Sequence, residues 1–165
     1  MKNVFFASLI LFFAFLSCRD DDRIIQNIDQ VMQLYIDSAG QDMLNNTIEG
    51  SYTNIQWNDV YGLLDNAPVS YSNKKDMDTV NFLEYVAGAR RLGIDSAGDR
   101  KTYESKIALL LTRRITDSTT AVTNDTMTIH YLSTPEVFQV SKVWYNNVLS
   151  FTKVDGEPNI IKIKK

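Results

Sequence analysis

The stretch TMTIHY, residues 126–131, decides the fold class of this chain. Its apolar residues Met127, Ile129 and Tyr131 alternate with polar ones, which is the period of a β-strand with one buried face. The stretch MQLYI, residues 32–36, repeats the pattern, with apolar residues in its first, third and fifth places. Both stretches predict strands that pack one face against a hydrophobic core.

Outside these two stretches, short apolar runs recur at intervals of roughly 8–14 residues, separated by turn residues such as DGEP at 155–158. This spacing is typical of an antiparallel β-sandwich of the immunoglobulin-like kind. We expect about seven to nine short strands in a single, mainly β domain. The further candidate strands are residues 53–64 with a break near Asn58-Asp59, 69–72, 80–86, 138–140, 143–151 and 160–163.

Two segments leave a short helix open as an alternative. In residues 102–114 the apolar side chains fit a helix as well as a strand, and residues 80–92 are a second candidate. The threonine-rich sequence that follows, with turn signals at Asp117-Ser118 and Asn124-Asp125, favours strands. A helix in either segment would make the domain α+β.

The first 17 residues have the features of a secretory signal peptide. Lys2 precedes an unbroken apolar run from Val4 to Leu16, and a small residue, Ser17, stands before Cys18. The run is too short to cross a bilayer, which takes about 20 apolar residues. We expect cleavage after residue 17, a tether over residues 18–28 and a β-rich domain over residues 29–165.

The residues around the cleavage point resemble those of a known class of lipoprotein. The sequence FLSC, ending at Cys18, is similar to a bacterial lipobox, and Arg19, Asp20, Asp21 and Asp22 resemble the export signal of Bacteroidota-type surface lipoproteins. The resemblance implies fatty acylation (palmitate) of Cys18 and an outer-membrane protein that is lipid-anchored and faces the cell surface. In the alternative interpretation the acidic residues are a solvated spacer and the protein faces the periplasm.

The rest of the chain is similar to small Bacteroidota lipoproteins that have no assigned activity. The matching residues are Asp37, Gly40, Asp42, Leu44 and Asn45 near one turn, and WYNN at residues 144–147 near the other end. These motifs are typical of turns. The resemblance therefore transfers no functional residue to this chain.

Composition excludes several classes of function. The 17 basic and 20 acidic side chains give a formal net charge of −3, which argues against nucleic acid as a partner. Cys18 is the only cysteine, so once it carries lipid no thiol remains for a disulfide, a zinc site or a nucleophile. We expect the membrane, through the lipid anchor, to be one partner and core burial alone to hold the fold.

Catalytic signals are sparse. His130 is the only histidine, which excludes sites built from two or three histidines, and motifs of serine nucleophiles or phosphate-binding loops do not occur. We expect a chain that is not an enzyme, with no metal and no cofactor apart from the covalent lipid on Cys18. The alternative is a carboxylate-dependent hydrolase, such as a glycan-processing enzyme, since two acidic residues suffice for that chemistry.

A heptad occurs twice, as LYIDSAG at residues 34–40 and LGIDSAG at residues 92–98. Two copies of one turn at the end of a strand account for the echo. Calcium sites at Asp37 with Asp42 and at Asp95 with Asp99 are the other interpretation. Neither copy has the acidic density of a calcium loop, so we favour the turns.

Aromatic residues are the remaining candidates for a binding surface. We expect Trp57 and Trp144 to lie mainly in the core, and Tyr61 and Tyr145, one place out of phase with apolar neighbours, to reach water. The candidate binding residues are Tyr61, Tyr145, Asn146 and Asn147. The sequence thus favours a non-enzymatic binding or accessory module, with an extracellular glycan or an outer-membrane protein as its partner.

Overall fold

The computed structural model describes residues 25–116 and 118–165, and every regular element in them is a β-strand. The chain is therefore mainly β, and the alternative helices at 80–92 and 102–114 were wrong. Within the described residues no helix could cross a membrane. The strands are β1 (Asn27–Asp29), β2 (Met32–Ser38), β3 (Gln41–Asp42), β4 (Tyr52–Asp59), β5 (Ser72–Lys75), β6 (Asn81–Tyr85), β7 (Leu92–Ala97), β8 (Arg100–Thr116), β9 (Thr119–Ser133), β10 (Val137–Tyr145), β11 (Val148–Thr152) and β12 (Asn159–Lys164).

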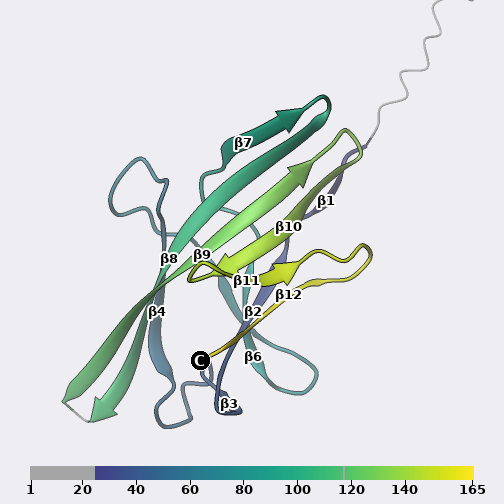
Figure 1. Ribbon diagram of the computed structural model, residues 1–165. Helices are drawn as coiled ribbons and strands as arrows, with labels where there is room; N and C mark the ends of the chain where they lie inside the picture. Colours follow the sequence, from purple (N-terminus) through teal and green to yellow (C-terminus); the bar gives the residue numbers. More distant parts are fainter. Residues whose placement is uncertain (1–24, 117) are drawn as a thin grey trace, which may run out of the picture.

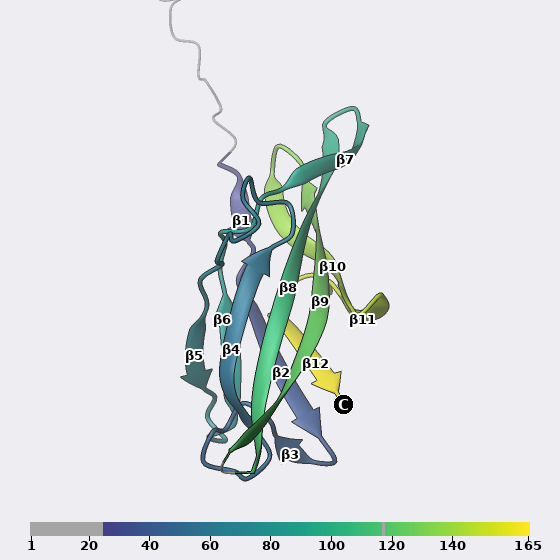
Figure 2. The ribbon, with the colours of Figure 1, turned by 90° about the vertical axis from the view of Figure 1, so that its left-hand side faces the viewer.

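The strands form two sheets. Sheet A has the order β1-β10-β9-β8-β4, with β11 also paired to β10 and β7 to β8. Sheet B has the order β12-β2-β6-β5, with β3 paired to β2. Sheet A is strongly twisted, and its long strands β8 and β9 run the length of the domain (Figures 1 and 2).

One hydrophobic core lies between the two sheets. Met32, Leu34 and Ile36 of β2 are at most 2% exposed, and Met127, Ile129 and Tyr131 of β9 are fully buried. Both stretches that predicted strands thus bury the expected face. Ile107, Leu109 and Leu111 of β8 are also fully buried, which confirms the strand interpretation of that ambiguous segment.

Two strand pairs run parallel, which corrects the expectation of a wholly antiparallel domain. β1 pairs parallel with β10, and β12 pairs parallel with β2. Both involve a strand from an end of the described chain that joins a distant strand, so no hairpin turn dictates its direction. Side-chain alternation fixes which face is buried but carries no information on strand direction.

The strands are also longer than expected. β8 has 17 residues and β9 has 15. Asn124 and Asp125, predicted as a turn, lie inside β9, because Asp125 finds polar partners in the interior. The predicted strand at 69–72 was also misplaced, since β5 begins only at Ser72.

A β-bulge in β10 overturns two further predictions. The pairing of β10 with β9 shifts register between Val140 and Lys142, so the buried positions change from Val140 to Val143 and Tyr145. Without that extra residue the buried face would continue through Trp144. Trp144 is therefore only half-buried, on the opposite face from the core, and Tyr145 is 5% exposed.

The two heptads end in hairpin turns, as expected. Ala39 and Gly40, with φ of 52° and 82°, connect β2 to β3. Gly98, with φ of 58°, begins the turn between β7 and β8. Both heptads thus end in a turn. The first turn begins at Ala39, whereas the equivalent Ala97 still belongs to β7 and the second turn begins one place later, at Gly98.

The N-terminal predictions fall largely outside the described residues. The signal peptide, Cys18, Arg19, Asp20, Asp21 and Asp22 lie there. Of the expected tether, residues 25–28 are described, and Asn27 and Ile28 already belong to β1. The folded part thus begins before the expected boundary at residue 29.

Candidate functional site

The outer face of sheet A, turned away from sheet B, carries the side chains that alternate with the core residues. Strand register arranges these side chains in rows across β4, β8, β9 and β10, where neighbours are in contact. The rows are Gln56, Leu110 and Asn124; Asn58, Ala108 and Thr126; Lys106, Thr128 and Trp144; and Glu104, His130 and Lys142.

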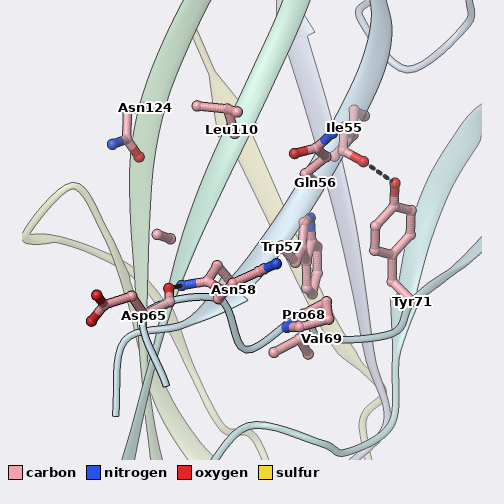
Figure 3. Close-up of a pocket in the computed structure, with 12 residues that line it drawn as sticks. Ile55, Gln56, Trp57, Asn58, Asp65, Pro68, Val69, Tyr71, Leu110 and Asn124 are labelled. Carbon is pink, nitrogen blue, oxygen red and sulfur yellow. Dashed lines mark hydrogen bonds between the residues drawn. The ribbon is translucent and has the colours of Figure 1, made fainter. Parts of the chain in front are cut away.

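A hollow of about 500 Å³ lies at the first two rows, between the sheet and the loop that follows β4 (Figure 3). Ala108 and Leu110 line it on β8, and Pro68 lines it on the loop. Four amide side chains also line it, those of Gln56, Asn58, Asn66 and Asn124. Asp65 contributes the one carboxyl group among the lining residues, so the hollow is mostly neutral, with apolar and amide surface.

The ring of Trp57 lies behind the hollow. It is 2% exposed and packs against Tyr71, with ring centroids 5.0 Å apart, which confirms it as a core residue. The Tyr71 hydroxyl donates to the Ile55 carbonyl at 2.6 Å (Figure 3). These aromatic rings stiffen the wall of the hollow and offer little ring surface to a ligand.

The loop beside the hollow is fixed by hydrogen bonds. Asn58 donates from Nδ2 to the Asp65 carbonyl at 3.1 Å and accepts from the Ala67 amide at 2.6 Å. The buried carboxylate of Asp59 accepts from the backbone amides of Tyr61 and Arg90. A Cβ at Gly62 would lie 2.4 Å from that of Ala67, so only glycine fits this turn. The hollow is therefore largely preformed.

A second group of polar side chains lies further along the same face. The Tyr61 hydroxyl donates to Glu104 Oε1 at 2.5 Å, and His130 Nε2 lies 2.8 Å from Glu104 Oε2. The Trp144 ring packs against His130 with centroids 4.4 Å apart. We call Tyr61, Glu104, His130 and Trp144 the outer cluster.

The hydrogen bonds of the outer cluster shift the acidities of its members. The Tyr61 hydroxyl lowers the pKa of Glu104, and His130 lowers it further, against a smaller opposing effect of burial. The same bond to Glu104 raises the pKa of Tyr61 to about 12. Glu104 is thus an ionised acceptor, and Tyr61 a neutral donor, at neutral pH.

The hydrogen bonds of the outer cluster differ from those of a serine or threonine nucleophile paired with histidine. A serine or threonine nucleophile would donate its hydroxyl to the imidazole. Here the Tyr61 hydroxyl donates to the carboxylate of Glu104, and Ser141 donates to the backbone carbonyl of His130. The cluster instead offers the partly exposed Trp144 ring and the carboxylate of Glu104, which suit recognition.

Tyr145 and Asn146 belong to a different group, on the inner face of sheet A. The Tyr145 hydroxyl donates to Asp125 Oδ2 at 2.6 Å, Asn146 Nδ2 donates to Asp125 Oδ1 at 2.8 Å, and Lys165 forms an ion pair with Asp125. We call Tyr145, Asn146, Asp125 and Lys165 the inner cluster. The prediction that Tyr145 reaches water was wrong.

Asn146 and Asn147 form the two-residue turn between β10 and β11. Their φ values of 49° and 66° are those of a type I′ turn, which asparagine tolerates well. Asn146 also caps the backbone of Thr126. Of the four predicted binding residues, the structure leaves Tyr61 half-buried beside Glu104 and Asn147 exposed in the turn between β10 and β11.

Sequence reasoning missed Glu104 and gave no functional role to His130, the one histidine of the chain. Glu104 and His130 are directly opposed in the pairing of β8 with β9. Because Glu104 and His130 each neighbour a buried residue, Ser105 and Ile129, strand alternation predicts that both side chains point away from the core. Their pairing required the register, which no local pattern carries.

Acidic residues at the turns serve the backbone. Asp37 accepts from the Gly40 amide and Asp42 from the Leu44 and Asn81 amides, while Asp95 accepts from the amide of Ser96. The described residues contain no group of three or more potential histidine, cysteine or carboxylate metal ligands. These aspartates therefore account for the turn chemistry of the heptads.

Comparison with known proteins gives no further guide: no family model, no curated protein and no solved structure matches this chain.

Proposed function

We propose that this chain is a lipid-anchored, non-enzymatic binding module and that its outer face of sheet A binds a neutral glycan. The observation that carries the proposal is the preformed hollow, in which amide side chains surround a small apolar patch. Amides donate and accept hydrogen bonds, as sugar hydroxyls do, and Leu110 and Pro68 can pack against the apolar face of a sugar ring.

The outer cluster extends this site along the sheet. Glu104 lies four residues before Ala108 on β8, which corresponds to about 13 Å along a strand. A ligand of several sugar units would reach from the hollow to the ring of Trp144 and the carboxylate of Glu104. Stacking on an aromatic ring and hydrogen bonds to a carboxylate are both suited to carbohydrate.

A binding role is favoured over the carboxylate-dependent hydrolase because of the charges at the hollow. Hydrolysis of a glycosidic bond takes two carboxyl groups on either side of the bond. Asp65 alone supplies a carboxyl group to the hollow.

Anchoring through Cys18 at the cell surface is the second part of the proposal, and the lipobox-like sequence supports it. The alternative is an anchor in the periplasmic leaflet. In whole cells, changing Asp20, Asp21 and Asp22 to alanine should preserve acylation but protect the protein from added protease, because it would no longer be at the cell surface. Equal cleavage of both proteins would assign the acidic residues to a spacer.

We also propose that the domain is an immunoglobulin-like sandwich. The single core between two sheets supports a sandwich, whereas the curl of sheet A and the two parallel pairs depart from the immunoglobulin pattern.

The test is titration calorimetry of the full chain in detergent with cellohexaose, maltohexaose and xylohexaose. We expect at least one to bind, and Ala108→Leu, which fills the hollow, to weaken that binding by about tenfold, the effect of roughly 1.4 kcal/mol. Thr112→Leu, on the same face of β8 but outside the hollow, is the matched control. Binding that is unchanged in Ala108→Leu, or no binding by any of the three, would contradict the proposal.

A further inference from the structure

Part of β9 in sheet A has an edge that no strand pairs with among the described residues. β10 pairs with β9 only as far as Tyr145 opposite Met127, and Asn146 then caps Thr126. Thr119–Asp125 therefore has β8 on one side, and on its other side no strand among those that the structure describes. This part of the β8–β9 hairpin extends to the lower left in Figure 1, at the opposite end from residue 25.

The backbone groups at this edge can be assigned. The amide and carbonyl of Thr126 face the side of β10, since they bond Asn146 Oδ1 and the Asn146 amide, each at 2.8 Å. Backbone groups of a strand alternate in direction, so Thr120, Val122 and Asn124 present theirs to the same side. Their side chains lie on the outer face, where Val122 is 57% exposed.

Three other strand edges in the described residues, those of β4, β5 and β7, are guarded. β5 carries Lys74 and Lys75, and β7 is interrupted by a register shift between Gly93 and Asp95. Amides of residues 59 and 69 tie the edge of β4 to the segment 67–69. By contrast, TTAVTN at 119–124 is uncharged, free of proline and largely β-branched. Proteins rarely leave such an edge open unless it pairs with something.

We propose that a second copy of this chain pairs with this edge, antiparallel, on a twofold axis at Val122. Val122 then faces the Val122 of the other copy, and Thr120 faces the other copy's Asn124. Thr120 and Asn124 lie at equal distances along the strand on either side of Val122. The two antiparallel strands can therefore form about six backbone hydrogen bonds in total. An uncharged edge also brings no repulsion when it meets itself.

The dimer joins β8 and β9 of both copies into one continuous sheet, with Val122 of both copies side by side on its outer face. The inference does not depend on a glycan, because it uses the strand edge and not the hollow. A peptide of another protein is the competing occupant of the edge.

The experiment is sedimentation equilibrium of the full chain in density-matched detergent. We expect a dimer for the natural sequence and for the control Val122→Thr, which preserves a β-branched side chain. Val122→Lys and Val122→Glu each place like charges opposite one another and should raise the dissociation constant by about tenfold or more. Mixing the Lys and Glu variants should restore the dimer, because opposite charges then meet at the axis.

Two results would overturn the proposal. One is a monomer of the natural chain at 100 micromolar, on the order of a weak protein interaction, which would leave the edge to another protein. The other is a dimer that persists in Val122→Lys, which would place the interface elsewhere. Circular dichroism of each variant checks that the β-structure is intact.

Discussion

Two carboxylates on opposite faces of sheet A have nearly the same partners. Glu104 accepts a hydrogen bond from the Tyr61 hydroxyl and contacts His130, while Asp125 accepts from the Tyr145 hydroxyl and pairs with Lys165. Their surroundings differ, since the side chain of Glu104 is 22% exposed and that of Asp125 is 5% exposed. Burial alone separates a group that can meet a ligand from one that holds the fold.

The comparison also explains why the inner cluster is complete. A buried carboxylate without partners would cost several kcal/mol, so each oxygen of Asp125 has a donor. The outer cluster is under less constraint, because water can replace a lost partner. Changes in the inner cluster should therefore affect stability and changes in the outer cluster should affect binding.

The largest effect is expected from removing the carboxylates. Asp125→Ala leaves the Tyr145 hydroxyl, Asn146 and Lys165 without their acceptor, and we expect a loss of about 3 kcal/mol in the free energy of unfolding. Glu104→Ala should cost less than about 1 kcal/mol, as is usual for a half-exposed pair. Urea denaturation of both variants measures the difference. Equal losses would break the contrast between the two clusters.

The tyrosine hydroxyls give a smaller version of the same contrast. Tyr145→Phe removes one buried donor to a charged acceptor and should cost about 1.5 kcal/mol, while the ring keeps its place in the core. For Tyr61→Phe we expect about 0.5 kcal/mol or less, because water can reach Glu104. Thermal unfolding followed by circular dichroism compares the two. A larger loss in Tyr61→Phe would assign the outer cluster a structural role.

The pH dependence of stability sharpens the comparison. Burial by itself raises the pKa of Asp125, but the hydrogen bonds from Lys165, Tyr145 and Asn146 outweigh it and hold the pKa below its usual value of 3.8. A carboxylate whose pKa is lower in the folded state than in the unfolded state adds stability at pH values above its unfolded-state pKa. That stability is lost as the pH falls through the folded-state pKa. The deficit of Asp125→Asn in urea denaturation should therefore be constant from pH 7 to 5 and shrink below about pH 4. A deficit that persists at pH 2.5, about one unit below the ordinary aspartate value, would mean that charge is not the cause.

The smallest expected effect is a change in the pKa of Tyr61. Because the Tyr61 hydroxyl donates a hydrogen bond to Glu104, Tyr61 should titrate with a pKa of about 12. Ultraviolet titration of the natural chain and of Glu104→Gln should show one phenol moving toward the ordinary value near 10 in the variant. Tyr145→Phe serves as the control, since it should leave that phenol unchanged. No difference between the natural chain and Glu104→Gln would show that the bond is absent in solution.

Much of the fold was predictable because burial leaves a local record. The alternation at 32–36 and 126–131 identified strands and the faces they bury, and the turn residues at Gly40 and Gly98 marked hairpins. The β-bulge near Ser141 made this reasoning fail for the end of β10. One inserted residue reverses every later side chain, so Trp144 was expected inside and Tyr145 outside.

The candidate site was less predictable. Tyr61 was singled out for its phase, but its partner Glu104 lies 43 residues away along the chain and His130 a further 26. The hollow depends on a loop held against β4 by Asn58 and Asp59. Neither the loop position nor the rows across the sheet leave a signal within a short window of sequence.

The sequence by itself determined the β class, the buried faces of β2 and β9 and the turn chemistry of the heptads, because each depends on neighbours a few positions apart. The tertiary structure alone decided strand order, the two parallel pairs, the partners of Glu104 and Asp125, and the edge of β9 that no described strand covers. These depend on register between distant strands. Register is set by the summed packing and hydrogen bonding of whole strands, which no single stretch contains.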